Sequence, residues 1–186
     1  MNVIRKILQR ITGQKPVPIT DQKPDPILSY YEQQTDHILA LNNFIEYYNQ
    51  KNVTAAEWFF ELNEVIADYM DSLTLEETNE LNREMWNWKD ETLGSLADPL
   101  LNTKNQNIDG AYLYCKIFLH TTIHEDEEYL IENIQACTWI KSPEVQLEFY
   151  LKLQDKVTRM NNSQNGQFDR YLKIINEKIT AEGLLK

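Results

Sequence analysis

The chain has 186 residues, with 18 Lys or Arg against 29 Asp or Glu, so its formal net charge is -11. A chain of this length can bury a core without disulfides or metals, and its apolar content of 42% argues against disorder. The acidic balance excludes general nucleic-acid binding by the body of the chain, because neutralising phosphates requires a basic surface, which only the first sixteen residues could offer.

Residues 1–12 are predicted to form a short basic amphipathic helix. Four apolar side chains share one narrow stripe, and basic side chains occupy the other side. Residues 1–16 contain four basic residues and no acidic one. The segment is therefore a candidate for docking onto a partner or the acidic body of the same chain, with weak membrane contact at most; the alternative is a frayed terminus without a function. The docking stripe consists of Ile4, Ile7, Leu8 and Ile11.

Residues 13–26 contain four of the six prolines and are predicted to be a linker. Beyond it, apolar residues recur at three- and four-residue spacings, so residues 27–186 are predicted to form one all-α domain. We expect a compact bundle of about seven helices, mostly antiparallel to their neighbours. The predicted helices cover residues 27–48, 54–72, 74–97, 111–121, 125–140, 142–160 and 168–182, and the polar loop 98–110 is a candidate subdomain seam.

Several helix ends carry recognisable signals. The sequences T-A-A-E at 54–57 and T-L-E-E at 74–77 are typical capping boxes. Asp98 and Pro99 are expected to end a helix, whereas Ser142, Pro143 and Glu144 are typical of a helix start. The run NNSQNG at 161–166 is expected to end the helix before it, and Gly183 to cap the last one.

An acidic stripe is predicted on the helix at 54–72. Five carboxylates fall within about 80° on a helical wheel, with no basic residue between them. Like charges at this spacing repel one another, so a basic partner, a metal ion or a basic segment of this chain is expected to compensate, unless the face is simply solvated. The stripe consists of Glu57, Glu61, Glu64, Asp68 and Asp71, and Phe60 flanks it as an apolar anchor.

Within this stripe, E-x-x-E at Glu61 and Glu64 precedes D-x-x-D at Asp68 and Asp71. The pattern resembles the carboxylate pairs of all-helical, magnesium-dependent nucleotide pyrophosphatases. That family takes its carboxylates from two facing helices, so the resemblance implies a second contributor. The best placed run consists of Glu125, Glu128 and Glu132, for which ordinary surface charge is the simpler explanation. In such a site, carboxylates hold magnesium against substrate phosphates and a water is activated for attack.

Two tryptophans stand two positions apart in REMWNWKD and cannot both face the core. Trp88 shares a helical face with Leu81 and Met85, so we expect Trp88 in the core. Trp86 is then at least partly exposed, either as an interface anchor or packed on a neighbouring element.

The histidines and cysteines provide no catalytic signature. His120 and His124 have the spacing of two zinc ligands, but the residues between them indicate a helix boundary. His37 follows Asp36, yet no motif supplies a nucleophile. Cys115 and Cys137 lie in apolar patterns, which predicts buried free thiols and a cytoplasmic protein.

These observations predict a cytoplasmic interaction protein of the inhibitor or toxin-immunity type, without a cofactor. It would bind a basic protein through the acidic stripe, with Phe60 and Trp86 as anchors. The alternatives are a metal-dependent nucleotide pyrophosphohydrolase-like enzyme and an adaptor tethered by its N-terminal helix.

Overall fold

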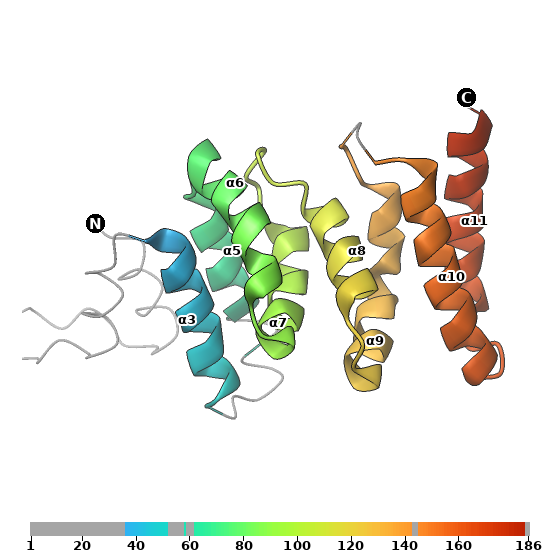
Figure 1. The fold of residues 1–186 in the computed structure, drawn as a ribbon, viewed down its shortest axis with the longest axis horizontal. Coiled ribbons are helices and arrows are strands. Elements are labelled where there is room, and N and C mark those ends of the chain that lie inside the picture. Colours follow the sequence, from blue (N-terminus) through green and yellow to red (C-terminus); the bar gives the residue numbers. More distant parts are fainter. Residues whose placement is uncertain (1–35, 52–57, 59–61, 143–144, 185–186) are drawn as a thin grey trace, which may run out of the picture. The chain divides into compact units, whose positions relative to one another are not determined.

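A computed structural model describes residues 36–51, 58, 62–142 and 145–184. These residues form eight α-helices and two 3-10 helices, and they contain no strand, which confirms the all-α prediction (Figure 1). The contacts divide the chain into two compact units, Met1–Asn107 and Ile108–Lys186. The division falls within the segment 98–110. No described helix combines the length and apolar composition that a membrane-spanning segment requires.

The first unit is built from four α-helices and a 3-10 turn in the residues that the structure describes. The helix α7 packs against both α3 and α5, while α6 packs against α3. Their apolar faces form the core, in which Ile45, Met70 and Leu96 are fully buried. The elements are α3 (His37–Asn49), α5 (Asn63–Asp71), α6 (Leu75–Glu84), η2 (Met85–Asn87) and α7 (Asp90–Asn102).

Side chains cap the starts of α3 and α6. The Asp36 carboxylate accepts hydrogen bonds from the amides of Ile38 and Leu39 at 3.1 and 2.8 Å. At α6, the amide of Glu77 donates to Thr74 Oγ1 and the amide of Thr74 donates to Glu77 Oε2. The capping box predicted at 74–77 is therefore confirmed, whereas the one at 54–57 lies outside the described residues.

The prediction of a single helix over 74–97 is wrong, because the helix is interrupted between α6 and α7. The 3-10 turn η2 follows α6, and Trp88 and Lys89 are extended before α7 begins at Asp90. Met85 and Leu93 are both buried on the two sides of the break. The interruption thus allows the residues before and after it to bury their apolar side chains without continuing one straight helix. Trp88, expected in the core, is only half-buried here.

The predicted loop start at Asp98 and Pro99 is also wrong, since α7 continues through both residues to Asn102. A proline in a helix interior costs about 3 kcal/mol. Here Pro99 is buried together with Leu96 and Leu100, and burying two leucines contributes a comparable amount. Packing therefore overrides the local stop signal, and the polar loop begins only at Thr103.

The second unit contains α8 (Gly110–His120), α9 (His124–Leu130), η3 (Ile131–Thr138), α10 (Leu147–Ser163) and α11 (Asp169–Leu184). The segment η3 packs against α8, α9 and α11, and α10 packs against α11 and α8. Figure 1 shows α10 and α11 as an antiparallel hairpin. Large residues in this core include Tyr114, Phe118 and Tyr150, which are almost completely buried.

Three predicted boundaries in this unit differ from the structure. The helix expected over 125–140 is α9 followed by the 3-10 segment η3, in which Asn133 has non-helical backbone angles. The helix expected from Ser142 begins at Leu147. The amides of Lys141 and Ser142 instead donate to Asp109 Oδ2 at 2.8 and 2.7 Å, which ties this segment to the start of α8.

The third difference concerns the turn after α10. The run at 161–166 was expected to end the helix at residue 160, but the turn begins later. The helix continues to Ser163, and Asn165 and Gly166 then adopt positive φ angles of 53° and 87°. Asn161 closes this turn, because its Oδ1 accepts from the amide of Phe168 at 2.6 Å and its Nδ2 donates to Asp169 Oδ1 at 2.7 Å. Gly183, expected as a cap, lies inside α11.

Candidate functional site

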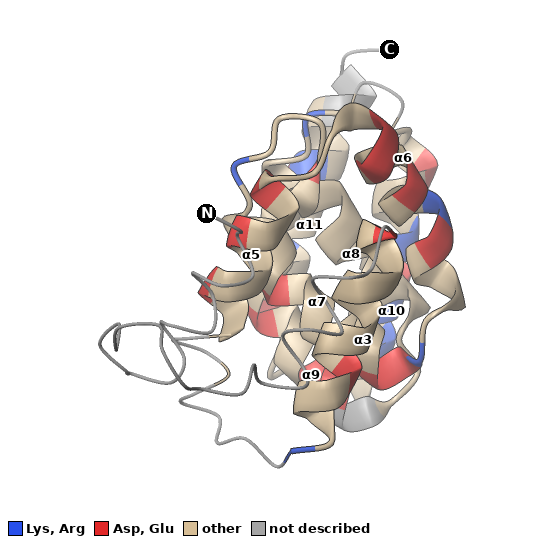
Figure 2. Ribbon diagram, turned by 90° about the vertical axis from the view of Figure 1, so that its left-hand side faces the viewer, with Lys and Arg blue, Asp and Glu red and all other residues tan. Residues whose placement is uncertain are grey.

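Acidic residues are concentrated in the first unit. Residues 36–107 contain 14 acidic and four basic residues, whereas residues 108–186 contain 12 acidic and nine basic ones. In Figure 2, Asp and Glu predominate on α5 and α6. Residues 36–107 thus have a formal excess of ten negative charges. Residues 36–107 therefore contribute a negative potential to the first unit.

The helix α5 presents two of the predicted carboxylates at the surface. Glu64 is exposed and Asp68 is half-buried, while Val65, Ile66 and Met70 on the other side of the helix are buried. The predicted amphipathic character of this segment is thus confirmed over α5. The other predicted members of the site, Glu57, Phe60 and Glu61, lie outside the described residues.

Asp71 has a different environment from Glu64 and Asp68. Its Oδ1 accepts three hydrogen bonds from the loop after α7, at 2.7 Å from Thr103 Oγ1, 2.5 Å from the amide of Lys104 and 3.1 Å from the amide of Asn105. The negative charge of Asp71 was expected to be compensated by a basic partner, a metal ion or a basic segment of this chain. Its hydrogen-bond donors are instead one hydroxyl and two backbone amides. Asp71 holds a loop in place, which limits its availability to a partner.

The same loop also closes the end of α5. The side-chain amide of Asn105 donates to the carbonyl of Met70 in the last turn of α5 at 2.8 Å and to that of Leu73, just beyond the helix, at 2.9 Å. The role of the 103–105 loop was missed at the sequence level. A signal was present, because a carboxylate at the last residue of a helix opposes the helix dipole and needs donors nearby.

Trp86 lies in η2, directly after α6. It is half-buried, as expected, and its Nε1 donates to the carbonyl of Asn82 at 2.8 Å. The main contacts pack α6 on α3 and α5 on α7. None of these main contacts joins η2, which carries Trp86, to α5, which carries Glu64 and Asp68.

A small polar cluster joins α3, α5 and α6. The His37 Nδ1 atom makes a short contact with Glu77 Oε1, and the Tyr69 hydroxyl donates to the His37 carbonyl at 3.0 Å. Hydrogen bonds from the hydroxyl and amide of Thr74, reinforced by His37, hold the pKa of Glu77 below its usual value. Burial, with the charges of Glu77 and Asp36, raises the pKa of Tyr69. The cluster fixes three helices to one another, and the described residues place no Ser or Cys nucleophile in these contacts.

The histidines His120 and His124 lie in different elements, at the end of α8 and the start of α9, so the predicted helix boundary between them is confirmed. Within the described ranges, no three His, Cys, Asp or Glu side chains are grouped so as to hold a metal ion. Asp71, one of the four carboxylates in the pyrophosphatase-like pattern, is already occupied by the loop at 103–105.

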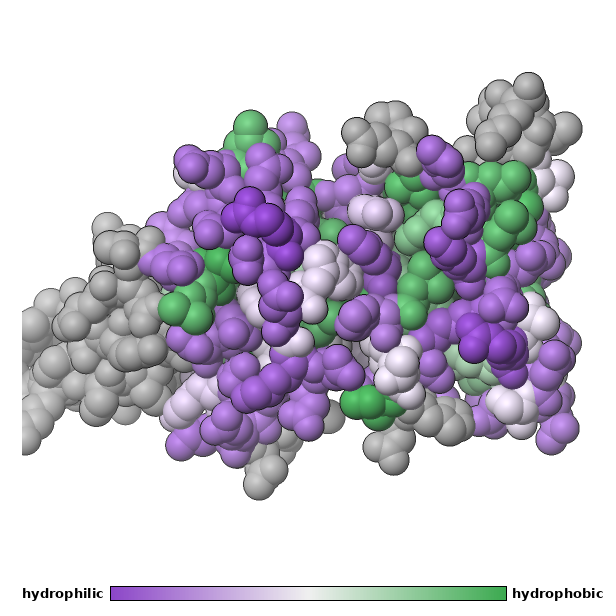
Figure 3. Space-filling view, viewed as in Figure 1, coloured by the Kyte–Doolittle hydropathy of each residue, from purple (hydrophilic) through white to green (hydrophobic). Residues whose placement is uncertain are grey.

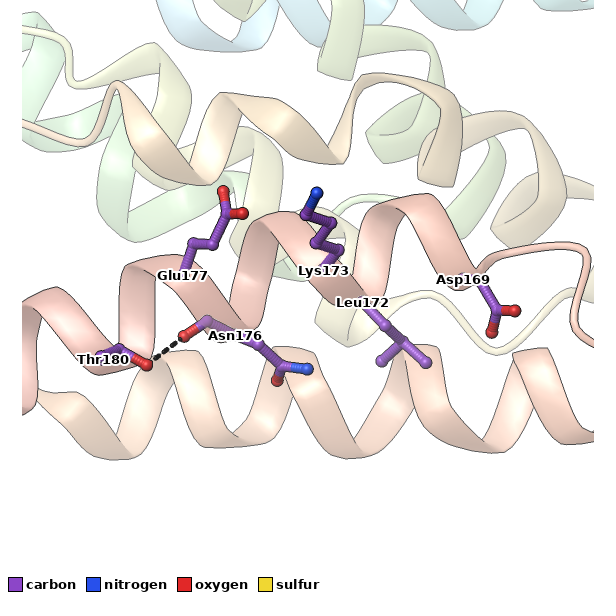
Figure 4. Close-up of a pocket in the computed structure, with 6 residues that line it drawn as sticks. All are labelled: Asp169, Leu172, Lys173, Asn176, Glu177 and Thr180. Atoms are coloured by element: carbon purple, nitrogen blue, oxygen red, sulfur yellow. Dashed lines mark hydrogen bonds between the residues drawn. The ribbon is translucent and has the colours of Figure 1, made fainter.

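The described surface of the second unit includes two hollows. The larger, of about 610 Å³, is lined by six residues that all belong to α11. Figure 4 shows Lys173 and Glu177 pointing to one side of this helix, and Leu172 and Asn176 to the other. Side chains that diverge from a single helix cannot enclose a small molecule, so this hollow is an open surface.

The smaller hollow, of about 480 Å³, is lined by six residues of α10, five of them charged, and by Leu119 of α8. The visible face of the first unit is mostly hydrophilic in Figure 3, whereas apolar and hydrophilic side chains lie next to each other over α8 and α10. On the face shown in Figure 3, the two units thus differ in how many apolar side chains they expose.

Cys115 and Cys137 are both free thiols with no exposed surface, as the sequence predicts. Burial raises the pKa of Cys137 to about 11 and raises the pKa of Cys115 as well. Thiolate formation is therefore suppressed at both positions.

Comparison of the chain with protein-family models, with curated proteins and with solved structures finds no match.

Proposed function

We propose that the protein is an interaction module that binds a basic partner protein through the acidic surface of its first unit. The observation that supports this most directly is the excess of ten negative charges over residues 36–107. Complementary charge accelerates the encounter of two proteins and disfavours partners of the wrong sign. An inhibitor or a toxin-immunity protein is the class that such a surface would suit.

The arrangement of α5 supports this surface as a contact site. Its apolar side is used by the core of the unit, which leaves Glu64 and Asp68 on the side away from the core. A partner could therefore approach α5 without disturbing the fold. Asp71 is excluded from the proposed contact set, because the loop at 103–105 occupies it.

The anchoring roles of Phe60 and Trp86 remain predictions, as do those of Glu57 and Glu61. The half-buried ring of Trp86 is compatible with partial coverage by a partner. The tether formed by Ile4, Ile7, Leu8 and Ile11 falls outside the described residues and also remains a prediction.

The experiment compares two double charge reversals of the full-length protein. The first variant is Glu64→Lys with Asp68→Lys in α5. The control is Glu132→Lys with Glu177→Lys, which changes the net charge equally but at exposed positions of the second unit. Proteins retained from a lysate of the native host by the immobilised chain are identified by mass spectrometry, purified and titrated calorimetrically.

We expect a partner with net positive charge, whose affinity falls by at least about tenfold for the α5 variant and much less for the control. Its affinity should also fall as salt is raised, because exposed charges are screened. Equal losses for both variants would indicate non-specific attraction, and undiminished binding of the α5 variant would refute the proposed surface.

A further inference from the structure

The turn that joins α10 to α11 contains the pair Asn165–Gly166. Both residues have positive φ angles, 53° and 87°, and the amide of Gln167 donates to the carbonyl of Gln164 at 3.2 Å. These features are typical of a type I′ turn, in which Asn followed by Gly is the preferred central pair. Asn165 is exposed, so water reaches this position.

The same pair is also chemically reactive. The backbone nitrogen of the residue that follows an Asn can attack the Asn side chain, and Asn is accordingly a thermolabile residue. A side chain on the following residue hinders this attack, whereas Gly has none. Asn165 is the only Asn in the chain that is followed by Gly. The exposed residues Asn107 and Asn162 are followed by Ile108 and Ser163, so sequence and exposure together single out Asn165.

The folded turn restrains the attacking nitrogen. The amide of Gly166 donates to the carbonyl of Asn161 at 3.0 Å, so its proton is not free to leave. The side chain of Asn161 accepts from the amide of Phe168 and donates to Asp169 Oδ1, at 2.6 and 2.7 Å. Asp169 Oδ2 also lies 3.4 Å from the position that a Cβ on Gly166 would take, so its negative charge disfavours a deprotonated nitrogen there. The attack therefore requires the turn to open, and Asn161 holds it closed.

We propose that Asn165 is a site of deamidation and that Asn161 controls how often the turn opens for this reaction. In the open turn, the nitrogen of Gly166 loses its proton to the solvent and forms a bond to Cγ of Asn165. The bond between Cγ and Nδ2 breaks, and the nitrogen takes a proton from water and leaves as ammonia. Water then opens the resulting succinimide ring at either carbonyl, which leaves an aspartate or an isoaspartate at position 165.

Either product alters the turn. Both add a negative charge to a segment that already has the carboxylate of Asp169 at its end. In the isoaspartate product, the main chain also passes through the former side-chain methylene, so it becomes longer and the type I′ geometry is lost. Gln164 links the turn to α9, because its Nε2 donates to Glu128 Oε1 at 2.5 Å. Deamidation is therefore expected to loosen the contact of this turn with α9.

The first experiment incubates the full-length protein at mildly alkaline pH, beside the same protein held unfolded in guanidinium. Samples are digested at acidic pH, which suppresses further reaction, and peptide mass spectrometry gives the deamidated fraction at each Asn. Methylation by a protein isoaspartate methyltransferase identifies the isoaspartate product. We expect Asn165 to react first in the folded protein, more slowly than in the unfolded chain, while Asn107 and Asn162 keep their amides. An intact Asn165 in the folded protein after the unfolded chain has reacted, or an earlier reaction at another Asn, overturns the proposal.

Two variants at neighbouring positions test the role of Asn161. Asn161→Ala leaves the amide of Phe168 without its acceptor, so the turn should open more often and Asn165 should react about tenfold faster. The matched control is Asn162→Ala at an exposed position, which leaves these contacts in place and should react at the rate of the wild type. Asn165→Gln should abolish the reaction in this peptide, because the longer side chain closes its ring far more slowly.

Circular dichroism verifies that Asn161→Ala is folded. If it is not, Asp169→Ala removes the acceptor of Asn161 Nδ2 at an exposed position. Asp169→Asn separates the two effects of this residue, because it removes the charge but keeps an acceptor oxygen. Asp169→Ala should therefore react faster than Asp169→Asn. Equal rates for the wild type and a folded Asn161→Ala, or for the two Asp169 variants, would show that Asn161 does not control the reaction.

Discussion

The ammonium group of Lys156 lies 2.8 Å from carboxylate oxygen Oε1 of Glu127, a pairing that joins α10 to α9 across the second unit. The same nitrogen donates to the carbonyl of Phe118 at 2.6 Å and to that of Thr121. It also lies 4.8 Å from the centre of the Phe118 ring. Lys156 thus closes the end of α8, where a positive charge is favoured by the helix dipole. Burial lowers the pKa of Lys156, and the bond to Glu127 opposes that effect.

Replacing this lysine should destabilise the second unit. Lys156→Met keeps the aliphatic stem but leaves Glu127 and two carbonyls without their partner. We expect a loss of about 2 to 3 kcal/mol in the free energy of unfolding, because removing one partner of a buried pair leaves the other desolvated. Urea denaturation followed by circular dichroism measures the change. The control is Lys152→Met in the exposed pair with Glu148, where we expect less than about 0.5 kcal/mol. Equal stabilities for the two variants would contradict this role.

Removing the carboxylate of Asp71 should release the loop at 103–105. Asp71→Ala leaves one hydroxyl and two amides without their acceptor, and we expect a loss of about 1 to 3 kcal/mol in the free energy of unfolding. Glu64→Ala, on the exposed side of the same helix, should change stability much less. Hydrogen exchange adds a local measurement, since the amides of Lys104 and Asn105 should exchange faster only in the Asp71 variant. Unchanged exchange at these amides would show that Asp71 does not hold the loop.

Acid should weaken the contact between α3 and α6 through Glu77. Because the pKa of Glu77 is lowered in the folded protein, the stability it provides is present above its ordinary pKa and is lost as the pH falls through the lowered value. Glu77→Gln preserves the shape and remains compatible with a capping box. The wild type should therefore lose more stability than this variant when the pH falls from neutral to strongly acidic. Denaturation curves at a series of pH values provide the comparison, and parallel losses would rule out this contribution.

The two cysteines should be chemically inert in the folded protein. Both thiols are buried and their pKa values are raised, so a thiol reagent such as Ellman's should label neither at mildly alkaline pH until the protein unfolds. In denaturant, both should react at once. Asn162→Cys, at an exposed position, provides a thiol that should react without denaturant. Rapid labelling of Cys115 or Cys137 in the native wild type would contradict the predicted burial.

Local patterns were sufficient to predict the helices and their inward faces. The apolar spacing predicted burial of Val65, Ile66 and Met70, and the T-L-E-E signal predicted the start of α6. Both signals act over one or two turns, so the residues that decide them are close in sequence. The boundaries were less predictable. Pro99 stays within α7 and the helix breaks instead at 85–89, because burial against neighbouring helices outweighed the local preference.

The sequence by itself therefore determined the helical class, the buried cysteines and an excess of negative charge before residue 108. The tertiary structure alone decided how individual charges are used. Asp71 receives donors from residues 32 to 34 positions away, and Lys156 meets carbonyls 35 and 38 positions away. Such pairings depend on how helices pack, and packing energy is distributed over many apolar contacts that no short motif encodes. One carboxylate of a regular stripe consequently became a loop anchor.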